Sequence, residues 1–255
     1  MAGHFNQFVW HDLSTLDMAT ATAFYTAVFG WSTQSDDPDY HQWANGKRGL
    51  GGMMILAEQA KAMGAPPNWM GYISVADVAA KAAQAQAAGA TVYVPPTAID
   101  GAGHFSVLAD PQGGVFALYQ SNRDYEQPEA GVGDFSWGEL ATDDLAAATA
   151  FYVGLFGWET QDTDMGGGWM YRLFKVPGGS RHLGGMFQKG PDMPFPTNWL
   201  HYITVSDIDA AVERIKAAGG AVMNGPMDVP GGDRVAQCSD DQGAGFGLHQ
   251  SPATE

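Results

Sequence analysis

The chain has 255 residues, enough for two ordinary domains, and its 12 Lys and Arg against 28 Asp and Glu give a net charge of −16. This charge disfavours binding to nucleic acid or to anionic membranes, which carry the same sign. A single cysteine, the absence of a signal-peptide pattern and the lack of any apolar run near the roughly 20 residues that span a bilayer predict a soluble, cytoplasmic protein.

A long internal repeat runs through the sequence. The pattern Phe-Tyr-(three residues)-Phe-Gly-Trp at 24–31 returns at 151–158, Leu-Gly-Gly-Met at 50–53 returns at 183–186, Asn-Trp at 68–69 returns at 198–199, and the segment 110–120 returns at 240–250. The offsets of 127, 133 and 130 residues are far longer than the roughly 20–50 residues of solenoid repeats. The repeat therefore predicts a duplicated domain, with small insertions in surface loops.

The first part of each half predicts a strand followed by a helix. Residues 8–13 are rich in aromatic and β-branched side chains, as in a strand. Asp17 then suits the N-cap of a helix over 18–29, which Gly30 ends. Asp144 and Gly157 repeat the two signals in the second half.

The second part of each half repeats the strand–helix order. A strand over 72–75 precedes a helix capped by Asp77 and stopped by Gly89, and Asp207 and Gly219 are the copies. Further strands are predicted at 91–94, 105–108 and 115–120, with a turn at 110–114. The polar stretch from residue 121 to residue 133 has the composition of a linker. We therefore predict one domain at 1–121, a linker at 122–133 and a second domain at 134–255.

These motifs resemble the vicinal oxygen chelate superfamily, which includes glyoxalase I, extradiol dioxygenases, and fosfomycin- and bleomycin-resistance proteins. The likeness is carried by the Asp-capped helix ending in Phe-Gly-Trp, the strand–helix at 72–89 and the Asp-Pro-Gln-Gly turn at 110–113, and it covers both halves, with Asp-Asp-Gln-Gly at 240–243 as the second turn. It implies an α+β fold of two tandem glyoxalase-like domains, as in a two-domain bacterial branch. Each domain would hold two βαβββ units that form a curved, cup-shaped, mostly antiparallel sheet. The units can pair within or across the halves, and the chain can be a monomer or a homodimer.

The resemblance also implies a divalent metal, held by three ligands from the first, fifth and last strands, typically His, His or Gln, and Glu. Counting from the shared motifs places six residues at these positions: Trp10, Trp137, Asn68, Asn198, Ala117 and Gly247. None of the six is a usual ligand for such a metal. We therefore expect no metal site and no cofactor, and we assign Trp10, Trp137, Asn68 and Asn198 to ligand binding.

Side chains two residues beyond these positions are expected to face the same interior, because side chains alternate along a strand. They are Asp12, Glu139, Tyr119 and His249. Glu139 and His249 are the candidate catalytic pair, since a carboxylate orients an imidazole for acid/base chemistry and raises its pKa. The alternative is that both lie at strand ends, solvated or capping loops. Asp12 and Tyr119 are candidate ligand-binding residues.

The repeated aromatics allow two interpretations. Tyr72 and Tyr202, like Trp10 and Trp137, recur at equivalent positions. Large aromatics are usually core residues, yet they also form the walls of ligand pockets, so both interpretations stay open.

Other conspicuous residues carry weaker hypotheses. His104 and its twin Arg234 would hold an anion at the mouth of the cup, or else cover a loop or face solvent. His201 is expected to face outward. The glycine-rich segment 49–53 lacks the tail of a phosphate loop and predicts a hairpin or bulge. Cys238 has no signature of an activated thiol and is interpreted as structural.

Three functions follow as hypotheses. The leading one is metal-independent binding of a small organic molecule in an aromatic-lined cup, as in the bleomycin-binding relatives. The second is a lyase, isomerase or dioxygenase that uses relocated ligands or the pair Glu139 and His249. The third is a partner-binding scaffold, which predicts an exposed apolar patch.

Overall fold

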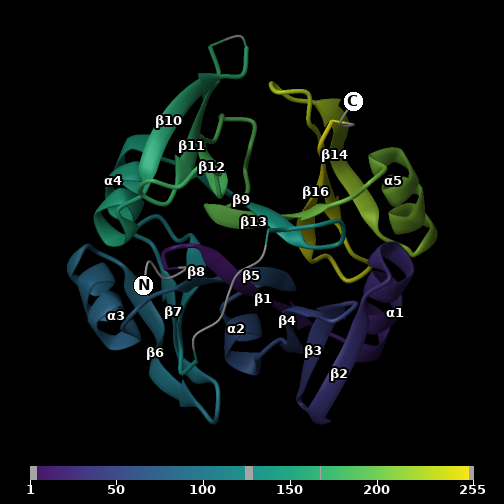
Figure 1. The fold of residues 1–255 in the computed structure, drawn as a ribbon, viewed down its shortest axis with the longest axis horizontal. Helices are drawn as coiled ribbons and strands as arrows, with labels where there is room; N and C mark the ends of the chain where they lie inside the picture. Colours follow the sequence, from purple (N-terminus) through teal and green to yellow (C-terminus); the bar gives the residue numbers. More distant parts are fainter. Residues whose placement is uncertain (1–4, 124–128, 167, 253–255) are drawn as a thin grey trace. The chain divides into compact units, whose positions relative to one another are not determined.

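The computed structural model describes residues 5–123, 129–166 and 168–252, so residues 124–128 of the predicted linker lie outside it. The elements in chain order are β1 (Phe8–Thr15), α1 (Met18–Phe29), β2 (Ser32–Asp37), β3 (Tyr40–Asn45), β4 (Arg48–Ile55), α2 (Glu58–Ala62), β5 (Asn68–Ser74), α3 (Val78–Ala87), β6 (Thr91–Ile99), β7 (Gly103–Ala109), β8 (Val115–Ser121), β9 (Phe135–Thr142), α4 (Leu145–Phe156), β10 (Glu159–Asp164), β11 (Met170–Lys175), β12 (Gly184–Gln188), β13 (Asn198–Thr204), α5 (Ile208–Ala217), β14 (Ala221–Asp228), β15 (Arg234–Ser239) and β16 (Gly245–Gln250) (Figure 1). None of the helices among these residues is long and apolar enough to cross a membrane.

The element order confirms the predicted α+β fold, with four βαβββ modules. Module 1 is β1-α1-β2-β3-β4, module 2 is β5-α3-β6-β7-β8, module 3 is β9-α4-β10-β11-β12, and module 4 is β13-α5-β14-β15-β16. In each module the first and last strands pair in parallel, and the other neighbours pair antiparallel.

Helices α1 and α4 begin and end where the repeat predicts. The Asp17 carboxylate accepts a 2.7 Å hydrogen bond from the backbone N–H of Thr20, and Gly30 ends α1 with a left-handed φ of 73°. In α4, Asp144 caps the N–H of Ala147 in the same way, and Gly157 has φ 69°. Asp at the cap and Gly at the stop thus satisfy the ends of both helices.

The chain divides into two compact units, and each takes one module from each half of the repeat. Within the described residues, unit 1 contains residues 5–9, 71–123, 137–166 and 168–199, which are mainly modules 2 and 3. Unit 2 contains residues 10–70, 129–136 and 200–252, mainly modules 1 and 4. The modules therefore pair across the halves, which was one of the two arrangements that the sequence left open.

A buried hydrogen-bond network explains in unit 2 why the repeated motifs recur together. The Tyr25 hydroxyl donates to Asp240 over 3.1 Å and accepts from Nε1 of Trp69 over 2.7 Å. Asp240 also accepts from the backbone N–H groups of Gln242 and Ala244, which closes the turn before β16. The network therefore joins helix α1 of the first half to a turn of the second half.

Unit 1 contains the same network built from the other copies of the motifs. The Tyr152 hydroxyl donates to Asp110 over 2.9 Å and accepts from Trp199 Nε1 over 2.9 Å. The Gln112 side chain bonds both the backbone N–H and the carbonyl of Asp144, at 2.6 and 2.9 Å, and so holds the start of α4. The repeated motifs are thus structural: they join two modules within each unit.

Strand register separates two faces of each module, as module 3 shows. Leu140, Phe174 and Met186 lie on the face packed against α4, in the core of unit 1. Trp137, Glu139, Tyr171 and Phe187 alternate with them and lie on the other face. We call this face, opposite the module's helix, the cup face.

The glycine-rich segment 49–53 lies in β4 and contains the predicted bulge. The register against β3 shifts between Trp43 and Ala44, which marks the bulge. A Cβ at Gly51 would lie 1.7 Å from the carbonyl oxygen of His11, so only glycine allows β4 to approach β1 this closely.

Candidate functional site

A tyrosine joins a tryptophan to a carboxylate on the cup face of module 3. The Tyr171 hydroxyl donates to Oε2 of Glu139 over 2.9 Å and accepts from Nε1 of Trp137 over 3.0 Å. Gly185 lies beside Glu139 on the neighbouring strand, and a Cβ there would meet the Tyr171 ring at 1.9 Å. The glycine therefore makes the room in which the tyrosine ring reaches the carboxylate.

Module 1 of unit 2 builds the same arrangement from its own residues. The Tyr40 hydroxyl donates to Oδ1 of Asp12 over 2.9 Å and accepts from Nε1 of Trp10 over 3.0 Å. The Trp10 indole also donates to Asp12 directly, over 2.9 Å. Gly52 has the role of Gly185, because a Cβ there would meet the Tyr40 ring.

The two arrangements include four of the predicted site residues and two that the sequence did not single out. Trp10 with Asp12, and Trp137 with Glu139, lie together as their spacing of two along a strand predicts. Tyr40 and Tyr171 come from β3 and β11, strands that the sequence analysis did not place. The available signal was a tyrosine upstream of each repeated Gly-Gly pair.

The surroundings of the two arrangements differ. In module 3 an apolar cluster surrounds the tyrosine, and we call it the Tyr171 cluster; it consists of Ala141, Tyr171 and Phe187, with Trp137, Met165, Leu173 and Met193 packed against them. Trp169, at 42 % exposure, adds its ring 5.4 Å from that of Phe187. In module 1, register places Gln42 and Met54 at the positions of Leu173 and Phe187.

Module 2 places Tyr72 and Tyr119 on its cup face. Tyr72 pairs with Ala117 and lies 6.5 Å from the Phe105 ring, and it is 6 % exposed. The Tyr119 hydroxyl donates to the carbonyl of Ala102 over 3.1 Å. Tyr72 therefore has the burial of a core residue, and Tyr119 supports a loop.

Module 4 places Tyr202 and His249 on its cup face. The Tyr202 ring covers Gly247, where a Cβ would meet it at 2.2 Å, and its hydroxyl accepts from Gln237 Nε2 over 3.2 Å. The His249 ring lies 3.5 Å from the Ser136 hydroxyl through Nδ1 and 3.5 Å from Asp233 through Nε2. His249 belongs to unit 2 and Glu139 to unit 1, and their action as a catalytic pair stays a prediction.

The two asparagines at the fifth-strand positions begin β5 and β13. The Asn68 amide donates to the carbonyl of Pro66 over 2.8 Å, which is a turn contact. The Asn198 side-chain oxygen is buried and has no hydrogen-bond partner among the residues that the structure describes. Their role in ligand binding stays a prediction.

The expectation that His201 faces outward is wrong. His201 is 1 % exposed, and its ring meets that of His11 edge-on at 4.7 Å; His11 in turn stacks on Phe135 at 3.9 Å. Burial lowers the pKa of His201 to about 3, and burial with the neighbouring His201 places the pKa of His11 well below its usual value. Both rings therefore pack as neutral core groups.

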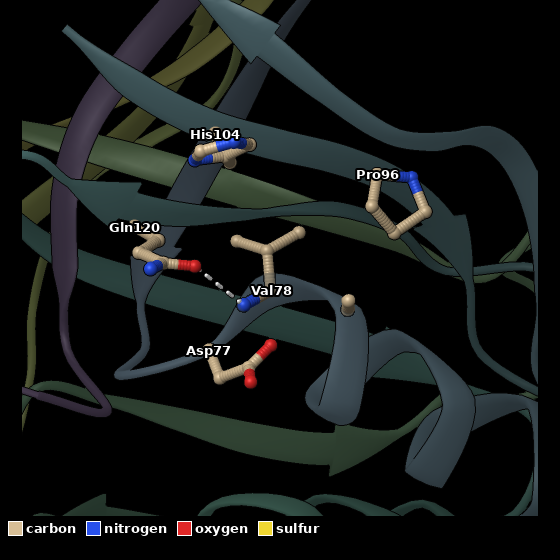
Figure 2. A pocket seen from close by; sticks show the side chains of 6 residues that line it. Asp77, Val78, Pro96, His104 and Gln120 are labelled. Atoms are coloured by element: carbon tan, nitrogen blue, oxygen red, sulfur yellow. Dashed lines mark hydrogen bonds between the residues drawn. The ribbon is translucent and has the colours of Figure 1, made fainter.

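Of the alternatives for His104 and Arg234, the anion site at the mouth of the cup is wrong, and His104 is exposed to solvent. His104 pairs with Gln120 on the helix face of its sheet, beside the start of α3 (Figure 2). A cavity of about 270 Å³ lies there, lined by Asp77, Val78, Ala79, Pro96, His104 and Gln120. Arg234 lies at the equivalent place in unit 2 and forms a bidentate ion pair with Asp209 at 2.7 and 3.1 Å, so it is not available to an anionic ligand.

Cys238 is a buried free thiol. Burial raises its pKa to about 12, so the thiolate is scarce at neutral pH. This fits the structural role predicted for it.

No group of three or more His, Cys, Asp or Glu side chains able to hold a metal ion occurs in the described part of the chain. On the cup faces of modules 1 and 3, a phenol, a carboxylate and an indole N–H are joined by hydrogen bonds. Such a site can orient a ligand by hydrogen bonds and offer it an apolar wall.

Comparison with known proteins identifies the family. Residues 135–248 match the model of the glyoxalase/bleomycin resistance protein/dioxygenase superfamily, and residues 9–119 match that of a glyoxalase-like domain. The chain is 35 % identical over 251 residues to the protein named "Putative glyoxylase CFP32" of Mycobacterium tuberculosis, covering 94 % of this chain and 92 % of the relative. It is 30 % identical over 267 residues to the anthracycline biosynthesis protein DnrV of Streptomyces peucetius, with 94 % and 91 % coverage. The chain therefore belongs to the glyoxalase/bleomycin resistance/dioxygenase superfamily, the one that the motifs resemble.

Solved structures support the fold. The Mn(II)-bound glyoxalase from Novosphingobium aromaticivorans superposes with a TM-score of 0.68 at 16 % identity, covering 97 % of this chain and 82 % of that one. Catechol 2,3-dioxygenase superposes with a TM-score of 0.66 at 15 % identity, covering 99 % and 92 %. At these identities the likeness concerns the fold alone.

Proposed function

We propose that the protein binds a small organic molecule on the cup face of module 3, without a metal at the positions that the superfamily usually uses. The observation that carries the proposal is the Trp137–Tyr171–Glu139 line set within the Tyr171 cluster. A few oriented polar groups within an apolar, aromatic surface are typical of small-molecule sites. We further infer that the protein acts in the cytoplasm, as a monomer or homodimer.

The residues at the expected metal positions do not fit a metal. Trp10 and Trp137 occupy the first-strand positions, and their indole Nε1–H groups donate to tyrosine hydroxyls. An indole nitrogen has no acceptor lone pair to offer a cation. Ala117 and Gly247, at the last-strand positions, have no ligating side chain. These donor sets support a ligand held by hydrogen bonds and apolar contact.

A second candidate function is metal-free acid/base catalysis on the same face. The observation that favours it is the 2.9 Å hydrogen bond between the Tyr171 hydroxyl and Glu139, two groups able to exchange a proton with a bound molecule. Under this alternative, Glu139→Gln or His249→Ala abolishes turnover while the fold survives. Unchanged turnover in both variants removes these residues from the mechanism.

The test combines metal analysis with ligand screening. Protein purified without chelators is analysed for Mn, Fe, Ni and Zn, and a diverse library of small organic molecules is screened by thermal shift on the wild type and on Glu139→Gln. We expect less than stoichiometric metal and hits that the substitution weakens. Stoichiometric metal, lost in Glu139→Gln, contradicts the proposal, as does a screen in which no molecule raises the melting temperature.

A further inference from the structure

The two cup faces that carry a Trp–Tyr–carboxylate line are not equally suited to an aromatic ligand. In module 3, Phe187 lies across from Tyr171, and Leu173 lies across from Gly185. In module 1 the equivalent residues are Met54 and Gln42. The apolar wall around the line is therefore aromatic in module 3, and it includes a polar amide in module 1.

The wall of module 3 is also accessible. Trp169 is 42 % exposed, and its ring lies 5.4 Å from Phe187 and 6.2 Å from Tyr171. Trp137 is partly buried, whereas Tyr171 and Phe187 are buried, at 7 % and 5 % exposure. The accessible part of the wall is therefore formed by the two tryptophans, and exposed large aromatic side chains of this kind mark binding surfaces.

The charge on this face is negative. Glu139 lies on this face, is partly exposed, and accepts a hydrogen bond from Tyr171 at Oε2. Lys175, which register places on the same face, pairs with Glu159 at 3.3 Å. With a net charge of −16 on the whole chain, the field attracts cations, and indole and phenyl faces bind cations as well.

We propose that the cup face of module 3 selects flat aromatic molecules that carry a positive charge, such as protonated aromatic amines, and that the cup face of module 1 does not. The aromatic ring of the ligand lies against Trp137 and Trp169, of which Trp169 packs on the buried Phe187, and its charged N–H donates to Glu139. The inference rests on the proposed function, whose ligand class it names.

The test is a fluorescence titration of the full chain with three probes in 150 mM salt, which screens non-specific attraction to an acidic surface. The probes are acridine orange, a flat aromatic cation; 9-anthracenecarboxylate, a flat aromatic anion; and tetraethylammonium, a cation without a ring, measured by displacement. We expect acridine orange to bind with one site per chain and at least tenfold more tightly than either other probe.

Matched variants locate the site. Glu139→Gln is expected to weaken acridine orange about tenfold, the loss of a hydrogen bond to a charged group, while Asp12→Asn in module 1 changes it less than twofold. Phe187→Met, which gives module 3 the residue of module 1, is expected to weaken it severalfold, and Met54→Phe leaves it unchanged. Melting temperatures of all four variants verify that the fold survives.

Each other outcome is decisive. Equal binding of the aromatic anion, or equal effects of Glu139→Gln and Asp12→Asn, overturns the inference. If no probe binds but neutral molecules from the thermal-shift library do, the inference fails and the proposed function stands. If neither probes nor library molecules bind, the proposed function itself fails.

Discussion

Units 1 and 2 contain the same buried Trp–Tyr–Asp hydrogen-bond network, and they differ in residues outside this network. In both, a buried tyrosine joins a tryptophan to an aspartate that closes a turn: Tyr152 with Asp110 in unit 1 and Tyr25 with Asp240 in unit 2. Because both units need these groups to join two modules, the motifs recur. Differences between the units are therefore where a separate role is to be sought.

Three places differ. The cup face of module 3 is aromatic where that of module 1 carries Gln42 and Met54. The helix side of module 2 has a cavity beside His104, where module 4 has the Arg234–Asp209 ion pair. The buried pair of His11 and His201 in unit 2 corresponds to Gly138 and Gly71 in unit 1.

The largest expected effect tests whether the buried Trp–Tyr–Asp networks of the two units stabilise the fold equally. Asp240→Ala removes the acceptor of Tyr25 and of two backbone N–H groups, all within the core, and is expected to lower the free energy of unfolding by about 4 kcal/mol. Asp110→Ala, which does the same in unit 1, is expected to match it. Urea denaturation followed by circular dichroism measures both.

The exposed neighbour supplies the control for this pair. Asp241→Ala removes a carboxylate next to the turn and is expected to change the free energy of unfolding by less than about 0.5 kcal/mol. If either Asp240→Ala or Asp110→Ala proves nearly neutral, the two buried networks do not stabilise the fold equally.

The second effect is the pH dependence of the free energy of unfolding that the buried histidines of unit 2 cause. The folded-state pKa values of His11 and His201 lie below that of a free histidine, so the unfolded chain binds more protons below pH 6.5. For His201 this contribution is fully present above pH 6.5 and is lost as the pH falls toward 3, at a cost of about 2 kcal/mol between pH 6.5 and pH 5. The lowered pKa of His11 adds to the loss in the same direction.

Thermal unfolding between pH 5 and pH 7.5 measures this loss. His201→Gln keeps a neutral polar side chain and is expected to flatten the acid side of the profile, whatever it does to stability at pH 7.5. His104→Gln, which makes the same substitution at an exposed position of unit 1, is the control for the substitution itself. An unaltered acid limb in His201→Gln contradicts the assignment.

A third, smaller effect distinguishes the last strands of modules 2 and 4. Gly247→Ala places a methyl group against the base of the Tyr202 ring, which cannot swing away without losing its bond to Gln237. It is expected to cost about 2 kcal/mol. Ala117→Gly, at the equivalent position beside Tyr72, is expected to cost about 1 kcal/mol through backbone freedom alone. Denaturation curves that rank the two variants in the opposite order disprove the role of Gly247.

The smallest effect concerns the cavity beside α3. The double substitution Ala79→Asp with His104→Arg copies the ion pair of unit 2 into unit 1 and is expected to raise stability by less than about 1 kcal/mol, because the pair is exposed to solvent. Either single substitution is expected to be neutral or slightly destabilising. A double-mutant cycle by thermal unfolding measures the coupling, and a zero coupling shows that the cavity does not accept the pair.

Local signals in the sequence were sufficient for much of the fold. Asp17 and Gly30 mark the ends of α1 because capping depends on neighbouring residues alone. Alternation along the first strand placed Trp10 with Asp12, and Trp137 with Glu139. The tyrosines that complete both lines, Tyr40 and Tyr171, come from strands with weak local patterns, so their position depended on pairing with β4 and β12.

The burial of His201 is a second feature that the local sequence pattern could not predict. A histidine between apolar residues on a strand is compatible with either face, and only its contact with His11, from a strand far away in the sequence, decides that it is buried. His104 likewise lies on the helix face because register with Gln120 places it there.

By itself the sequence determined the family, the four βαβββ modules and the helix ends, since these depend on short-range motifs that occur twice. Only the tertiary structure decided that each unit takes one module from each half. Both copies of the tyrosine, tryptophan and aspartate motifs are chemically equivalent partners, so the local pattern is satisfied by either pairing. The choice is made by which strands and turns the folded chain brings into contact, as Tyr25 with Asp240 shows.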